Sequence, residues 1–254
     1  MKPPADVDRW ASLAALTPAR IALGRAGPSL PTREVLSFAF DHARARDAVH
    51  IPLDAPSVTR QLQAMGFETL EVDSAAADRA TYLRRPDLGR RLAPASQALL
   101  DSRPPCRTDV QLIVADGLSS TAVHAHAAPL LGALAPHAGA QGWRLGPVVL
   151  AHQARVALGD EIGERMGARF VVLLVGERPG LSSADSLGAY LTYAPRVGRT
   201  DAERNCISNI RPAGLSYEDA ALRIAWHVSE SLRRGYSGIA LKDESASGRL
   251  AGPR

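Results

Sequence analysis

The stretch VVLLVGERPGLSSADSLGAYLTYAP, residues 171–195, decides the fold because a polar loop interrupts two strand-like patterns within it. The apolar run over 171–175 has the length and composition of a fully buried strand. A carboxylate and a guanidinium, Glu177 and Arg178, follow where this strand leaves the core. A turn needs only the neighbouring glycine and proline residues. The adjacent charges therefore indicate either a binding site or a surface ion pair, and spacing alone favours neither.

The composition is that of a globular protein with a substantial core. The chain has 254 residues, 46% of them apolar and 22% charged, so we expect one large domain or one domain with a smaller attachment. The net charge is +4, and no basic stripe or motif indicates nucleic acid. Cys106 and Cys206 lie far apart, which suits a reducing compartment. Without a long apolar run or a secretory signal, the sequence predicts a cytoplasmic protein with no membrane span.

The first hundred residues have mainly helical patterns. Apolar spacing predicts a helix over 32–49, with Thr32 as its cap, and a second helical stretch over 88–102. The prolines of 103–106 then indicate a linker. We therefore expect a mainly helical N-terminal region over 1–104.

After the linker, strand and helix patterns alternate up to the C-terminus. Strands are expected at 109–117, 146–153, 169–176, 186–195 and 237–243. Helices are expected over 118–139, over a short segment capped by Asp160 and closed by Gly167, and after a capping box of Ser216 and Asp219. Such alternation predicts βαβ units, and we interpret 105–254 as a Rossmann-like, doubly wound α/β domain with a largely parallel sheet.

Ligands of such sheets bind beyond the carboxyl ends of the strands, which is where Glu177 and Arg178 lie. No GxGxxG or Walker A loop is present to hold an ordinary dinucleotide or nucleoside triphosphate. His124 and His126 point about 200° apart on a helix, so they do not form a metal site. Asp116, at the end of another strand, either binds a ligand or caps the next helix, and we favour the cap.

Several separated motifs carry a family resemblance. They are GRAGP (24–28), DHARARD (41–47), RPDLGRRL (85–92), DVQLIVADGLS (109–119), GERPGLSSADSL (176–187) and CISNIRPAG (206–214). In this order, over residues 20–240, the chain resembles the small (light) subunit family of ethanolamine ammonia-lyase. The GERPG and CISNI blocks are the most specific of these motifs.

The resemblance implies half of an adenosylcobalamin-dependent lyase. In that family a TIM-barrel large subunit binds ethanolamine, and the Rossmann-like small subunit closes over the cobalamin between the two chains. A 5′-deoxyadenosyl radical takes a hydrogen from ethanolamine, and acetaldehyde and ammonia leave. The family assembles as six heterodimers, and some members are packaged in a bacterial microcompartment, which the sequence leaves open here. The alternative function is a non-catalytic, Rossmann-type binder of a corrinoid or a nucleotide.

The resemblance also implies the cofactor-binding residues. The matching positions are Val156, Glu177 and Cys206. Each follows a predicted strand, so all three loops would emerge at one sheet edge if those strands are parallel. Taken alone, the valine would be read as core packing and the cysteine as a small apolar residue. Arg155, Arg178 and Ser208 flank these positions, and the sequence alone assigns them no part in cofactor binding.

Overall fold

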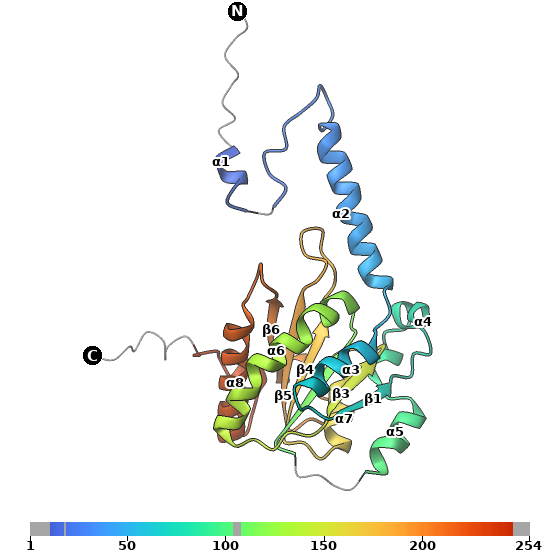
Figure 1. The fold of residues 1–254 in the computed structure, drawn as a ribbon, viewed down its shortest axis with the longest axis vertical. Helices are drawn as coiled ribbons and strands as arrows, with labels where there is room; N and C mark the ends of the chain where they lie inside the picture. Colours follow the sequence, from blue (N-terminus) through green and yellow to red (C-terminus); the bar gives the residue numbers. More distant parts are fainter. Residues whose placement is uncertain (1–10, 18, 104–107, 246–254) are drawn as a thin grey trace, which may run out of the picture.

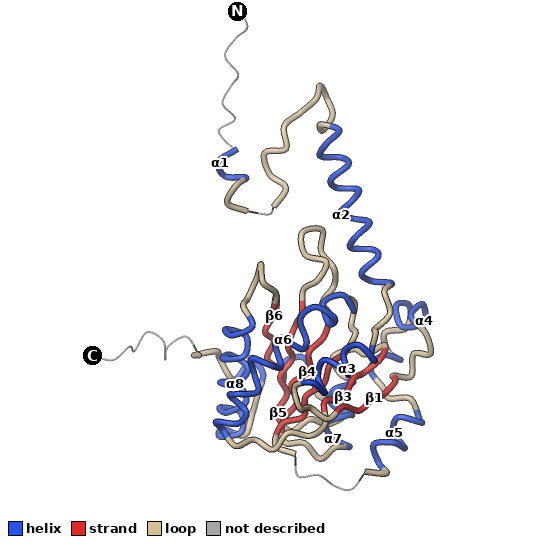
Figure 2. The backbone as a smooth tube through the Cα atoms, viewed as in Figure 1, coloured by secondary structure: helices blue, strands red, loops and turns tan. Residues whose placement is uncertain are grey.

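A six-stranded mixed sheet forms the centre of the molecule (Figures 1 and 2). The computed structural model describes residues 11–17, 19–103 and 108–245, so most of the predicted linker and Cys106 lie outside the described residues. The strand order is β1-β3-β2-β4-β5-β6. The strands are β1 (Thr69–Asp73), β2 (Val110–Ala115), β3 (Val148–His152), β4 (Phe170–Gly176), β5 (Leu187–Tyr193) and β6 (Arg204–Ile210). β1, β3, β2 and β4 run parallel, whereas β5 is antiparallel to both β4 and β6.

Helices cover both faces of this sheet. They are α1 (Ala11–Ala14), α2 (Thr32–His50), α3 (Ala55–Ala64), α4 (Arg79–Arg84), α5 (Pro94–Asp101), α6 (Ser120–Gln141), α7 (Leu158–Arg165) and α8 (Tyr217–Arg234). Three short 3₁₀ turns complete the described structure: η1 (Leu88–Arg90), η2 (Asp201–Glu203) and η3 (Gly238–Ala240). No helix within these described stretches is long and apolar enough to cross a membrane.

The two faces of the sheet make two apolar cores. Leu112 and Val114 of β2 point into the first core, which α3, α6 and α8 cover. Ile113 of β2 points into the second core with α5 and α7. Every residue of β2 and β4 is buried, because helices shield both faces of these central strands. This double burial explains why both strands are near-continuous apolar runs in the sequence.

The structure corrects the predicted elements at the sheet edges. The N-terminal region expected to be mainly helical contributes β1, which pairs with β3, so both predicted regions share one sheet. The predicted last strand, 237–243, is instead the 3₁₀ turn η3. β6 replaces it at the edge, and its mixture of exposed and buried residues hid it from the apolar pattern. The expected division of the chain near residue 104 stays a prediction.

Of the helix caps predicted at Thr32, Asp160 and Ser216, one is confirmed. The Ser216 hydroxyl accepts from the backbone N–H of Asp219 at 3.1 Å and starts α8. Thr32 lies inside α2, where Pro31 precedes the helix without a side-chain cap. Asp160 lies inside α7 and is committed to an ion pair described below. The predicted close of α7 at Gly167 is confirmed by its left-handed φ of 62°.

Helix α2 extends away from the sheet (Figure 1). Among its side chains only Ala48 is buried, whereas Leu36 and Phe40 are each 64% exposed. Exposed apolar side chains on a projecting helix are typical of a surface that a partner covers.

Candidate functional site

At the carboxyl ends of β2 and β3 the chain turns toward opposite faces of the sheet. After β2 the chain enters α6 over the first core, and after β3 it enters α7 over the second core. Such a switch point leaves a crevice in which open α/β sheets bind ligands. A cavity of about 440 Å³ opens here. Its lining includes Tyr82, Gly117, Arg155, Val156, Glu177 and Tyr190.

Two glycines bring the loops after β2 and β4 into close contact at this edge. A Cβ atom added to Gly117 would overlap the carbonyl oxygen of Gly176, and one added to Gly176 would overlap the backbone of Ser119. The N–H of Leu118 donates to the carbonyl of Gly176 at 2.9 Å. Gly117 also has a left-handed φ of 56°, which a side chain would strain. The floor of the cavity therefore depends on both glycines.

Asp116 fixes the loop that follows β3. Its buried carboxylate accepts from the backbone N–H groups of Gln153, at 2.9 Å, and Ala154, at 3.0 Å. Burial raises the pKa of Asp116, while these two bonds oppose that shift. The expected capping role is wrong, because the Ser119 hydroxyl caps α6 instead. Asp116 positions the backbone that carries Arg155 and Val156.

Glu177 is held by hydroxyl and backbone donors from β6 and from the residue that precedes β5. Its carboxylate accepts from the hydroxyls of Ser186 and Ser208 and from the N–H of Asn209 at 3.2 Å. The surface ion pair considered from the sequence is not found, because no described ion pair joins Glu177 to Arg178. The carboxylate is therefore fixed at the cavity and keeps acceptor capacity toward a ligand.

Cys206 lies within β6, so the prediction that it sits in a loop is wrong. It is opposite Tyr190 in the register of β5 and β6. Its neighbour Ile207 points into the first core, so Cys206 faces the other side of the sheet, as Tyr190 does. That face is open at β6, and the cysteine is exposed and free of a disulfide.

The titration of Cys206 is linked to its neighbours. Desolvation raises the pKa of the thiol, a hydrogen bond with Tyr190 lowers it, and the charge of Glu177 raises it further. Burial also raises the pKa of Tyr190 to about 12. Both groups are therefore protonated near neutral pH, and because the Tyr190 hydroxyl donates to the sulfur, the Cys206 thiol is the donor left for a ligand.

Val156 supplies an apolar wall of the cavity. It is half-buried, packs against the second core and lines the same cavity as Glu177. The structure thus brings two of the three predicted residues together directly. It connects the third, Cys206, through Tyr190, which lines the cavity and lies opposite the cysteine in the register of β5 and β6.

Sequence reasoning missed the aromatic floor of the cavity. Tyr82 is fully buried and its hydroxyl donates to the carbonyl of Ala154 at 3.1 Å. The guanidinium groups of Arg79 and Arg155 lie 4.9 Å and 4.4 Å from the centre of its ring. Tyr82 comes from the mainly helical region, and its proximity to the RPDLGRRL motif was the only signal available in the sequence.

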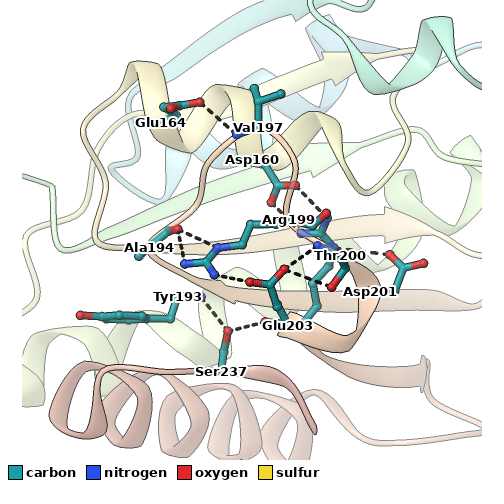
Figure 3. Close-up of polar contacts among 11 residues, drawn as sticks. Asp160, Glu164, Tyr193, Ala194, Val197, Arg199, Thr200, Asp201, Glu203 and Ser237 are labelled. Carbon is teal, nitrogen blue, oxygen red and sulfur yellow. Dashed lines mark hydrogen bonds and ion pairs between the residues drawn. The ribbon is translucent and has the colours of Figure 1, made fainter. Parts of the chain in front are cut away.

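A buried ion pair fixes the strand that carries Cys206 (Figure 3). The Arg204 guanidinium donates to both carboxylate oxygens of Asp160, at 2.7 Å and 2.8 Å. It also donates to the carbonyl of Arg199 at 2.7 Å. Burial raises the pKa of Asp160 to about 6, although Arg204 opposes the shift. The pair joins α7 to the start of β6 and so connects the strand to the loop of Val156.

The histidines of the expected helix separate as predicted. His124 accepts from the backbone N–H of Asp54 at 2.8 Å, and His126 contacts the hydroxyl of Tyr217 at 2.9 Å. Across the part of the chain that the structure describes, no cluster of potential ligands could hold a metal ion.

A larger cavity of about 710 Å³ lies at the opposite, amino edge of the sheet, between Phe67, Leu145 and Glu164. None of the three predicted residues lines it. Strand ends that bind ligands in this fold class are the carboxyl ends, so we take the smaller cavity as the candidate site.

Comparison with known proteins decides the family. The family model described as ethanolamine ammonia-lyase light chain matches residues 7–242. The chain belongs to the ethanolamine ammonia-lyase light-chain family. It is 58% identical to the ethanolamine ammonia-lyase small subunit of Ralstonia nicotianae, over 92% of this chain and 88% of the relative. It is 54% identical to that of Azotobacter vinelandii, over 98% of this chain and 93% of the relative.

Membership of the ethanolamine ammonia-lyase light-chain family makes the chain a subunit of an ammonia-lyase. The family match includes all six strands and the loops after β2, β3 and β4 that form the candidate site. The small subunit of Bradyrhizobium diazoefficiens is also 57% identical, over 92% of this chain. The resemblance noted in the separated motifs is therefore confirmed.

Proposed function

We propose that the carboxyl edge of this sheet covers a cobalamin in an adenosylcobalamin-dependent ethanolamine ammonia-lyase. The enzyme would convert ethanolamine to acetaldehyde and ammonia. The observation that carries the proposal is the grouping of Val156 and Glu177 around one switch-point cavity, with Cys206 opposite Tyr190, which also lines that cavity. The sequence motifs alone indicate these residues, which lie up to 50 positions apart in the chain.

The chemistry of these residues fits the rim of a corrin ring. Cobalamin carries peripheral amides, which donate and accept hydrogen bonds, on a largely apolar ring. Glu177 can accept from an amide N–H, the Cys206 thiol can donate, and Val156 offers apolar contact. The buried Nε of Arg155 has no hydrogen-bond partner, so one donor in the cavity is left for a ligand.

A cobalamin is too large for the cavity of about 440 Å³ to enclose it. This chain would therefore supply one wall, and a second chain the other. When bound, adenosylcobalamin supplies the radical that starts the deamination. The residues of this chain would hold the ring in place and exclude water from one side.

The second chain would be the large subunit, a TIM barrel that binds ethanolamine. The name small subunit, which the relatives carry, supports such a partner. We assign the exposed apolar side chains Leu36 and Phe40 of α2 to that contact, because they project from the domain uncovered. The remaining proposals are an assembly of six heterodimers and a location in the cytoplasm or in a bacterial microcompartment.

We also propose a Rossmann-like, doubly wound description for 105–254, with 1–104 as a separate region. The divergence of the chain after β2 and β3 supports the first part. The antiparallel strands β5 and β6 distinguish this sheet from an all-parallel one.

The test is an assay of acetaldehyde release from ethanolamine, with adenosylcobalamin and the large subunit, in the presence and absence of this chain. We expect activity only when both chains are present. Equal activity without this chain would contradict the proposal. Cobalamin bound by this chain alone, with no effect on the assay, would instead favour the non-catalytic binding protein.

A further inference from the structure

Arg155 is held at the cavity without an anionic partner. Its guanidinium lies over the ring of Tyr82, with 4.4 Å between Cζ and the ring centre. Its backbone N–H donates to the carbonyl of Gly89 at 2.8 Å, which fixes the start of the side chain. Its Nε is buried and has no hydrogen-bond partner. A buried N–H donor of this kind costs free energy unless a ligand accepts from it.

The carboxylates near Arg155 are committed elsewhere. Asp116 accepts from the backbone of Gln153 and Ala154, and its nearest guanidinium belongs to Arg79, at 3.5 Å. Glu177 accepts from two serine hydroxyls and a backbone N–H. Throughout the described residues, no carboxylate forms an ion pair with Arg155.

A second guanidinium lines the same cavity. Arg178 is exposed and follows Glu177 at the end of β4, whereas Arg155 follows β3. No described carboxylate forms an ion pair with Arg178 either. Two uncommitted guanidinium groups that line one cavity create a positive site that favours an anion. Phosphate oxygens suit guanidinium best, because its N–H groups form a rigid fork that can bond two oxygens at once.

We propose that Arg155 and Arg178 bind a phosphodiester, and that this is the phosphodiester of the nucleotide tail of cobalamin. This inference rests on the function proposed above, and it assigns a particular part of the cofactor to this cavity. The tail carries the single negative charge among the side chains of the ring, whereas the peripheral amides are neutral. The cavity would thus bind the tail, and Glu177 and Cys206 would face the ring amides.

The test compares three corrinoids that differ only in this tail. Cyanocobalamin carries the phosphodiester and the base, cobinamide phosphate carries a phosphate without the base, and dicyanocobinamide carries neither. The dissociation constant of each is measured by absorbance titration of the assembled two-subunit enzyme. The variants are Arg155→Gln and Arg178→Gln. The control is Arg60→Gln, which removes one exposed charge from α3, away from the cavity lining.

We expect Arg155→Gln to weaken binding of cyanocobalamin and cobinamide phosphate by about tenfold to a hundredfold, the usual range for a lost charge-assisted hydrogen bond. Dicyanocobinamide binding should change less than about threefold. Arg178→Gln should show the same pattern with a smaller loss, since its side chain is more exposed. Arg60→Gln should leave all three dissociation constants unchanged.

Two outcomes would overturn the inference while leaving the proposed function intact. Equal weakening of all three corrinoids by Arg155→Gln would mean that the guanidinium bonds a ring amide. Weakening of cyanocobalamin alone would mean that it contacts the base. If the unmodified complex bound none of the corrinoids, the proposed function itself would fail, whatever the variants showed.

Discussion

The Asp160 carboxylate and the Arg204 guanidinium form a two-pronged ion pair, although 44 residues separate them in the chain. Both side chains are 3% exposed. Removing one partner of a buried pair leaves the other charge uncompensated, which costs about 3–5 kcal/mol. We therefore expect Arg204→Met to lower the free energy of unfolding by that amount, measured by urea denaturation.

The double variant Asp160→Leu/Arg204→Met provides the control for this pair. Because it leaves no buried charge behind, it should be more stable than Arg204→Met alone. A single variant within about 1 kcal/mol of the unmodified chain would contradict the structural role of the pair.

Replacement of Asp116 tests how the Val156 loop is positioned. Asp116→Ala leaves the backbone N–H groups of Gln153 and Ala154 without their acceptor, and each such buried donor costs about 1–3 kcal/mol. We expect a loss of at least that size in urea denaturation, together with weaker cobalamin binding by the assembled enzyme. Glu244→Ala, which removes an exposed carboxylate outside the cavity lining and outside α2, is the matched control and should change neither quantity.

The reactivity of Cys206 should follow its raised pKa. Because the folded chain holds the proton more tightly than the unfolded chain, alkylation by iodoacetamide at pH 8 should be slower in the folded state. By the same linkage, the stability contributed by this group is complete below the ordinary thiol value of 9.0 and is lost as pH rises above it. Mass spectrometry of the Cys106→Ser chain, folded and in urea, follows this single site.

Tyr190→Phe provides the control for this titration. Its hydroxyl lowers the pKa of Cys206, so its removal should slow alkylation further. Faster alkylation of the folded chain than of the unfolded chain at pH 8 would contradict the raised pKa of Cys206.

The apolar surface of α2 should affect assembly more than folding. Leu36→Ser and Phe40→Ser remove exposed side chains, so the free energy of unfolding of the isolated chain should change by less than about 0.5 kcal/mol. Association with the large subunit, measured by analytical ultracentrifugation, should weaken in the double variant. Unchanged association would exclude this face of α2 from the interface.

The central strands could be predicted from the sequence because burial on both faces leaves a continuous apolar run. β6 could not, since it is an edge strand whose residues Cys206 and Ser208 face solvent while Ile207 is buried. β5 also runs antiparallel to both of its neighbours, so its carboxyl end lies at the opposite edge of the sheet, and no periodicity in the sequence reports strand direction. The expectation that three loops emerge at one edge of the sheet was therefore right for the loops of Val156 and Glu177 but wrong for Cys206.

Sequence patterns could not predict which groups contact the candidate site residues. Glu177 accepts from Ser208, which lies 31 residues away, and this contact depends on the pairing of β5 between their two strands. Tyr82 reaches the same cavity from a helix that no strand pattern connects to the site. Motif resemblance found the residues, and only the fold supplied what holds them.

The most direct test of the proposed cobalamin site is a cofactor titration of the assembled enzyme carrying Glu177→Ala. Loss of a hydrogen-bonded carboxylate should weaken cobalamin binding by about 1–3 kcal/mol, which is roughly fivefold to 150-fold in the dissociation constant. Ser208→Ala removes one donor to that carboxylate but keeps the acceptor, so its effect should be smaller. We predict that Glu177→Ala raises the dissociation constant for cobalamin while the two-subunit complex stays intact. An unchanged dissociation constant in that complex would contradict the assignment of this sheet edge to the cofactor.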